Sequence, residues 1–176
     1  NSLFYLLLNE VIMPKEVTQK RLMELFEYDK DSGVFKRLVS NGGRWKVGSI
    51  AGTTLNSDYV KISVDGLIYV AHRLAWLYIN GNMPRNDIDH INGDKRDNRL
   101  SNLRIATRSQ NMQNCKHARI NNKSSGLLGA YKNKKNWCSK ITLDGKQYSL
   151  GTYKTPEIAH AVYLAAKRKY HEYCTI

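Results

Sequence analysis

Residues 88 to 111 read Ile-Asp-His-Ile-Asn-Gly-Asp-Lys-Arg-Asp-Asn-Arg-Leu-Ser-Asn-Leu-Arg-Ile-Ala-Thr-Arg-Ser-Gln-Asn. With the residue before it, the stretch predicts a strand over 87–90, a loop over 91–100 and a second strand over 103–106. A helix is expected to begin after Thr107, whose hydroxyl can accept a hydrogen bond from a free backbone N–H of the first turn. The prediction is therefore a compact strand–loop–strand–helix unit.

Polar side chains with complementary chemistry gather on this unit. Asp89 and His90 are adjacent on a strand, so their side chains point to opposite sides. A carboxylate can hold a hard cation, whereas an imidazole with an ordinary pKa of about 6.5 can take a proton from water. Asn111 lies in the first turns of the helix and can face back toward the strands. These oxygen donors suit Mg²⁺ and tolerate Mn²⁺.

Asn102 precedes the second strand, where its side chain can hydrogen-bond across the glycine-containing loop and hold the two strands in register. The acidic residues of 94–97 could add further ligands, although loop carboxylates usually face water. An ordinary polar loop between two strands is the alternative interpretation. A lone Asp-His pair would fit that alternative, whereas the whole spaced set favours a hydrolytic site.

The set resembles the HNH, or ββα-metal, nuclease motif in the form found in phage and intron-encoded homing endonucleases. The resemblance rests on Asp-His, on Asp-Asn-Arg-x-x-Asn-Leu-Arg and on an Asn nine residues later. It implies a DNA endonuclease with His90 as general base, Asn102 as the structural central Asn of the catalytic motif, and Asp89 and Asn111 as ligands of one divalent metal. Many members have His where this chain has Asn111, which favours Mg²⁺ over Zn²⁺.

The chain before this unit predicts a small antiparallel sheet with two helices. Thr18 is the N-cap candidate of a helix over 19–26, and a strand is expected over 34–38. Asp65-Gly66 joins runs 59–64 and 67–70 in a predicted hairpin, followed by a helix over 72–78. His72-Arg73-Leu74-Ala75-Trp76 resembles the segment that leads into the motif. His72 could approach the scissile phosphate or, as we favour, pack or position it, and Arg73 and Arg104 are candidate phosphate contacts.

The last third predicts a separate module. Residues 121–125 are polar and mark the expected linker, followed by strands over 128–131, 137–143 and 147–150 and a helix that opens with Thr155-Pro156-Glu157. Strand alternation places Trp137, Ser139, Ile141, Tyr148 and Leu150 against the small side chains of this helix. The opposite face is expected to carry Tyr131, Asn133, Lys140, Thr142, Gln147 and Ser149. For Trp137 a core role is favoured, whereas Tyr131 fits either role.

Residues 125–173 resemble the Apetala-type DNA-binding domain of plant ethylene-response factors. The resemblance rests on Gly129-Ala130-Tyr131, on residues 137–142 and 150–153, and on the helical run 159–166. It implies that the polar sheet face enters the major groove of DNA. Plant members carry several Arg on this face, and this chain has Lys, Thr, Gln and Ser there. Bidentate recognition of guanine is therefore weakened, and a different target sequence is expected.

The net charge of the chain favours a polyanionic binding partner. The net charge is +13, of which residues 123–176 contribute +7 in less than half the length. Such an excess favours nucleic acid, although many small basic surfaces are merely solvated. Cys115, Cys138 and Cys174 are odd in number and widely spaced, as in reduced cytosolic proteins. The short apolar run at the start is a poor signal peptide, so residues 1–13 are interpreted as a leader outside the fold.

The expected fold is α+β: a leader at 1–13, an N-terminal region with the nuclease motif at 14–120 (core 70–118), a linker at 121–125 and a DNA-binding domain at 126–176. The expected function is a cytoplasmic homing-type endonuclease that acts on double-stranded DNA as a monomer or weak dimer and nicks one strand per site, without a membrane or small-molecule partner. A phage regulator with an inactive nuclease motif is the rival hypothesis. An RNA-binding module is disfavoured because aromatic pairs spaced for base stacking are missing from the sequence.

Overall fold

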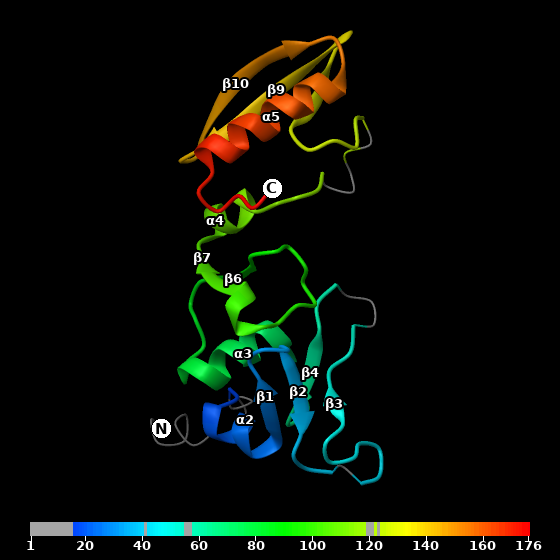
Figure 1. The fold of residues 1–176 in the computed structure, drawn as a ribbon, viewed down its shortest axis with the longest axis vertical. Coiled ribbons are helices and arrows are strands. Elements are labelled where there is room, and N and C mark those ends of the chain that lie inside the picture. Colours follow the sequence, from blue (N-terminus) through cyan, green and yellow to red (C-terminus); the bar gives the residue numbers. More distant parts are fainter. Residues whose placement is uncertain (1–15, 41, 55–57, 119–121, 123) are drawn as a thin grey trace, which may run out of the picture. The chain divides into compact units, whose positions relative to one another are not determined.

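The computed structural model describes residues 16–40, 42–54, 58–118, 122 and 124–176, so the expected leader lies outside the described residues. The chain divides into two compact units, residues 1–83 and 84–176, and mixes helices with antiparallel sheets (Figure 1). This confirms the α+β class. Among the residues described, none of the helices is both long and apolar enough to cross a membrane.

The first unit builds its core from a three-stranded sheet, a hairpin and two helices. Its elements are α2 (Gln19–Leu25), β1 (Phe26–Asp29), β2 (Val34–Arg37), β3 (Ile50–Ala51), β4 (Lys61–Val64), β5 (Leu67–Val70) and α3 (Ala71–Asn80). Thr18 caps α2 as expected, because its hydroxyl accepts from the backbone N–H of Arg21 at 3.2 Å. The predicted hairpin over Asp65-Gly66 is confirmed by the pairing of β4 with β5.

Sequence reasoning extended the first helix to Phe26 and missed β1 and β3. The helix ends at Leu25 instead, because Phe26 and Tyr28 alternate with exposed Glu27 and Asp29 and pair with β2. Rings of Phe26, Tyr28 and Phe35 then pack together, with centroids 6.2 and 4.7 Å from Phe35. Burial of aromatic rings on one strand face outweighs the helical preference of the preceding turn.

The second unit opens with the predicted strand–loop–strand–helix unit. It consists of β6 (Asp87–His90), the short 3-10 helix η1 (Leu100–Asn102), β7 (Leu103–Ala106) and α4 (Arg108–Gln113). Strands β6 and β7 are antiparallel and pair Asp89 with Arg104. Thr107 and Gln110 form a reciprocal capping box at the start of α4. The predicted strand bounds and the N-cap are therefore confirmed.

The rest of this unit is a three-stranded sheet covered by one long helix (Figure 1). The strands are β8 (Ala130–Asn133), β9 (Asn136–Leu143) and β10 (Lys146–Tyr153) in the order β10-β9-β8, and the helix is α5 (Pro156–Tyr170). Ala130, Trp137 and Ala159 form its buried cluster, which confirms the core role of Trp137. Of the small side chains of the helix, Ala159 and Ala166 are buried, whereas Ala161 and Ala165 are exposed. Thr155 caps α5, and Pro156 opens it.

Two expectations for this sheet are corrected. β8 begins at Ala130 rather than 128, because Gly129 takes a positive φ of 76° under the ring of Tyr163. Tyr148 pairs with Ile141 on the helix side of the sheet, yet its side chain is 49% exposed. It stands on the edge strand β10, whereas the buried Trp137, Ser139 and Ile141 stand on the central strand β9.

The unit boundary differs from the expected linker at 121–125, of which only 122, 124 and 125 are described. The sheet-and-helix module and the strand–loop–strand–helix unit share one compact unit. The chain after α5 returns to the earlier residues: the Thr175 hydroxyl lies 2.9 Å from the carbonyl of Ile91, and an Arg104 nitrogen lies 2.7 Å from the carbonyl of Tyr173. Contacts across more than 60 residues of sequence therefore join the two parts.

Candidate active site on the strand–loop–strand–helix unit

Asp89 presents a buried carboxylate, with the residue 5% exposed. Nε and Nη2 of Arg104 lie 2.9 and 2.8 Å from its Oδ2. The side-chain amide of Asn114 lies 3.2 Å from Oδ1 and 3.1 Å from Oδ2. A buried carboxylate needs an opposite charge and hydrogen bonds, and both are supplied here from the facing strand and the end of α4.

His90 is 4% exposed and follows Asp89 on β6. Its Nε2 lies 3.4 Å from Oδ1 of Asn98, in the loop between the strands. Burial lowers the pKa of His90 below the ordinary 6.5, although the hydrogen bond to Asn98 and the charge of Asp89 oppose that shift. The imidazole is therefore neutral at neutral pH and has one ring nitrogen that can accept a proton.

Asn102 closes the loop between β6 and β7. Its Nδ2 donates to the carbonyl of Asp97 at 2.8 Å and to Oδ1 of Asn92 at 3.0 Å. Its Oδ1 accepts from the backbone N–H of Asn92 at 2.9 Å. The Asn102 residue is 6% exposed, and its three bonds to the loop are partly buried. The structure thus places Asn102 across the loop, as expected from the sequence.

The acidic side chains of the loop, Asp94 and Asp97, form hydrogen bonds and an ion pair within the loop. Asp97 pairs with the guanidinium of Arg99 at 2.6 and 2.8 Å, which lowers the pKa of Asp97. Asp94 accepts from the backbone N–H of Arg96 at 2.9 Å. Both side chains therefore stabilise the turn geometry, as Asp commonly does in loops.

Asn111 faces back toward the strand pair, as expected from the sequence, and hydrogen-bonds with Asp87 on β6. Its Nδ2 donates to Oδ2 of Asp87 at 3.3 Å, and Arg108 lies 3.6 Å from the same carboxylate oxygen. The amide that contacts Asp89 belongs to Asn114, three residues further along. Sequence reasoning missed Asp87, Asn98 and Asn114. The Asn111–Asn114 spacing of three was an available signal, because residues three apart are neighbours on one side of a helix.

The chain is similar to known proteins in two ways. A family model described as HNH endonuclease matches residues 69–113, which include Asp89, His90, Asn102 and Asn111. Protein 3.8 of Escherichia phage T7 is 32% identical over 103 residues, covering 57% of this chain and 83% of that protein. The chain belongs to the family of phage Protein 3.8 and carries an HNH endonuclease domain. No solved structure gives a significant match.

The HNH domain implies a divalent metal, and the donors near β6 fit a hard cation. Asp89 offers carboxylate oxygens. Asn111 directs its amide nitrogen to Asp87, so its oxygen is the end left for a ligand. Within the described residues no cluster of three or more His, Cys, Asp or Glu is found.

His72 and Arg73, which also belong to the matched segment, lie on α3 in the first unit. His72 is 8% exposed and its ring centroid is 5.4 Å from that of Tyr59. This burial accords with the packing role favoured from the sequence. Arg73 is half-buried on the same helix.

The polar face of the C-terminal sheet is contiguous and exposed. Strand register pairs Lys140 with Ser149 and Thr142 with Gln147, so these side chains share one face. Tyr131 is 49% exposed on that face, which settles its position outside the core. A groove of about 500 Å³ runs over it, lined by Tyr131, Lys132, Asn133, Cys138, Lys140, Gln147, Ser149 and Thr152.

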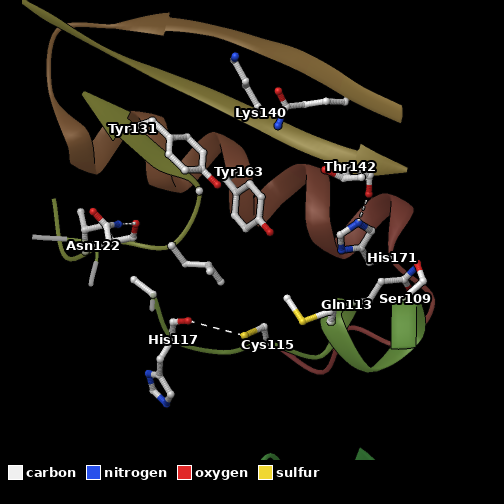
Figure 2. A pocket seen from close by; sticks show the side chains of 16 residues that line it. Ser109, Gln113, Cys115, His117, Asn122, Tyr131, Lys140, Thr142, Tyr163 and His171 are labelled. Atoms are coloured by element: carbon white, nitrogen blue, oxygen red, sulfur yellow. Dashed lines mark hydrogen bonds between the residues drawn. The ribbon is translucent and has the colours of Figure 1, made fainter. Parts of the chain in front are cut away.

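A second hollow of about 580 Å³ lies between the end of α4 and the sheet-and-helix module. Figure 2 shows Tyr131 and Tyr163 on one side of it, and His171 beneath Thr142 at one end. Nε2 of His171 donates to the carbonyl of Thr142 at 3.0 Å. Cys115 and His117 line the opposite side, where a Cys115 thiol contact to the His117 carbonyl holds the chain leaving α4.

Proposed function

We propose that this protein is a metal-dependent DNA endonuclease of the homing type that hydrolyses phosphodiester bonds and nicks one strand per active site. The observation that carries the proposal is the placement of Asp89 and His90 side by side on β6, both buried and each with its own hydrogen-bond partners. One chain supplies one such pair. A double-strand break then requires two chains or two encounters.

In this proposal His90 takes up the proton of the attacking water at a ring nitrogen. Its depressed pKa keeps the ring neutral at neutral pH, so it is ready to accept that proton. Asn98 and the strand fix the ring plane, and Asn102 fixes the loop that carries Asn98. Oxygens of Asp89 and Asn111 would hold Mg²⁺, with Mn²⁺ as a substitute. The bound cation supplies positive charge that offsets the charge of the phosphate.

Double-stranded DNA is the proposed substrate, and the polar face of β8–β10 is its proposed docking surface. Residues 123–176 carry a net charge of +7, and that face exposes Lys140 together with hydrogen-bonding side chains. A cationic sheet face with short polar side chains can contact phosphates and base edges in the major groove. Lys140, Thr142, Gln147, Ser149, Asn133 and Tyr131 are the proposed contacts.

A second candidate function is a DNA-binding phage regulator with an inactive nuclease motif. One observation favours it: both oxygens of Asp89 accept hydrogen bonds, one of them from a guanidinium. A carboxylate engaged in this way can serve a structural role without a bound cation. The two candidates share the DNA surface and differ only in hydrolysis.

Cleavage of supercoiled plasmid and phage genomic DNA with Mg²⁺, with Mn²⁺ and with EDTA separates the two. The wild type is compared with His90→Ala and with His117→Ala, a matched control at an exposed histidine of the same unit. Metal-dependent nicking that is lost only in His90→Ala supports the endonuclease. DNA binding without cutting of any substrate in either metal favours the regulator.

A further inference from the structure

The residues that follow α5, 171 to 176, form a C-terminal tail that reaches the candidate active site. The tail leaves the helix at His171, whose backbone N–H donates to the carbonyl of Lys167 at 2.9 Å. The backbone N–H of Tyr173 then donates to Oε1 of Gln113 at the end of α4, at 3.3 Å. The tail therefore runs from the sheet-and-helix module onto the HNH domain.

Tyr173 contacts the same Arg104 guanidinium that pairs with Asp89. Nη2 of Arg104 donates to the Tyr173 carbonyl at 2.7 Å, and its guanidinium carbon lies 4.2 Å from the centroid of the Tyr173 ring. The same guanidinium donates through Nε and Nη2 to Asp89. A planar guanidinium can stack on an aromatic ring and bond in its own plane at the same time. Arg104 is thus fixed between the tail and the buried carboxylate.

Thr175 holds Asn114 in a comparable way. Its hydroxyl lies 2.8 Å from Oδ1 of Asn114 and 2.9 Å from the carbonyl of Ile91, so one hydrogen is shared between two acceptors. A donor at Oδ1 leaves the Asn114 nitrogen to face Asp89 and the carbonyl of His90, at 2.9 Å from the latter. The hydroxyl therefore sets which end of the amide meets the carboxylate.

The start of the tail is anchored by groups that are themselves buried. Lys167 is fully buried, and its ammonium donates to the carbonyl of Cys115, just after Asn114. His171 is 8% exposed and donates to the carbonyl of Thr142 on β9. These two bonds tie the base of the tail to both parts of the unit, so its remaining residues approach Asp89 from a fixed direction.

We propose that the C-terminal tail is a positioning element of the HNH site: Tyr173 and Thr175 hold Arg104 and Asn114 on Asp89. The inference rests on the proposed function, in which Asp89 is a metal ligand. Partners that orient a metal ligand commonly affect metal affinity by about 10- to 100-fold. Tyr173 and Thr175 contact the partners of Asp89 rather than Asp89 itself. Removing their contacts is therefore expected to weaken cation binding by about tenfold or less.

Two matched pairs of full-length variants test the inference. Thr175→Val removes the hydroxyl at nearly constant shape, whereas Thr175→Ser retains it. Tyr173→Leu removes the ring beneath Arg104, whereas Tyr173→Phe retains it. The first readout is made without metal: the exchange of the Arg104 Nε–H and of the Asn114 side-chain amide, followed by NMR. The second is the dissociation constant for Mn²⁺ alone, with Asp89→Ala as the reference for a lost site. Thermal unfolding checks that each variant is folded.

The expected result is faster exchange and Mn²⁺ binding weakened by about three- to tenfold in Thr175→Val and Tyr173→Leu, with Thr175→Ser and Tyr173→Phe close to wild type. Wild-type exchange and affinity in all four variants would overturn the inference. A wild type without any Asp89-dependent Mn²⁺ site would overturn the proposed function instead. In that case the metal-free exchange decides the positioning role: faster exchange in Thr175→Val and Tyr173→Leu supports it, and unchanged exchange rejects it.

Discussion

Asn111 donates its side-chain amide to Asp87 at 3.3 Å, two residues before the carboxylate with which it is proposed to share a cation. Residues two apart on a strand face the same side, so Asp87 and Asp89 lie on one face of β6. Because the nitrogen of Asn111 is engaged with Asp87, its oxygen is the atom left for the proposed cation. Asp87 is thereby an orienting partner for Asn111.

Replacing Asp87 by Asn is expected to weaken Mg²⁺ binding by about tenfold, because the amide of Asn111 loses its charged acceptor and can rotate. The measurement is a Mg²⁺ titration of the full-length protein by calorimetry. Asp31→Asn, an exposed carboxylate of the first unit, is the matched control and should keep the wild-type affinity. An unchanged Mg²⁺ affinity in Asp87→Asn would show that Asp87 does not orient the cation site.

The pH dependence of cleavage should follow His90. Burial lowers the pKa of His90 from 6.5, and a general base must be deprotonated. The rate at saturating Mg²⁺ should therefore rise with pH and reach half its maximum below pH 6.5. The free energy of unfolding should also fall as the pH drops. Between the pKa of His90 in the folded protein and 6.5, the unfolded chain binds more protons than the folded protein, so acid favours unfolding in that pH window. An acid limb centred above pH 6.5 would contradict His90 as the base.

Lys140 is expected to contribute to DNA binding from the sheet face. Lys140→Gln should reduce the slope of log affinity against log salt by about 0.9, the value for one lost phosphate contact. The measurement is fluorescence anisotropy with duplex DNA in EDTA at several salt concentrations. Lys154→Gln, in the turn between β10 and α5, is the control. Equal slopes for Lys140→Gln and wild type would show that Lys140 makes no phosphate contact and that DNA binds to another surface.

Gly129 is expected to be intolerant of a side chain. A Cβ there would lie 2.0 Å from Cγ of Tyr163, and φ is +76°. Gly129→Ala should lower the free energy of unfolding by about 2–4 kcal/mol, from backbone strain together with overpacking. Gly145 has φ +77°, and a Cβ added there would meet no atom within 4 Å. Gly145→Ala therefore isolates the strain, at about 1–2 kcal/mol. Urea denaturation measures both, and equal losses would exclude the steric contribution.

Asn102→Ala is expected to destabilise the loop before β7. It leaves the backbone N–H of Asn92 and the carbonyl of Asp97 without their side-chain partner, at a cost of about 1–3 kcal/mol for each group that stays buried. Urea unfolding gives the loss of stability, and native-state hydrogen exchange shows where it acts. Faster exchange restricted to other parts of the chain would contradict a bracing role for Asn102.

The strand–loop–strand–helix unit was predictable because its signals are local. Thr107 and Gln110 define the start of α4 within four residues, and the bounds of β6 and β7 follow from turn residues around them. The spacing of Asp89, His90 and Asn102 also predicted the HNH motif that the family model matches, without any tertiary information. Local hydrogen bonds and chain geometry carry such features, so short windows of sequence contain them.

Only the tertiary structure shows that the side-chain amide of Asn114, rather than that of Asn111, hydrogen-bonds with Asp89. Asn111 and Asn114 are one helical turn apart, and the packing of α4 on the strands selects between them. The contacts of Tyr173 and Thr175 span 69 and 61 residues of sequence. No periodic pattern encodes such contacts, because they depend on how α5 and the tail pack against the HNH domain. The sequence by itself determined the HNH motif and its local fold, and long-range packing decided which groups surround the buried carboxylate.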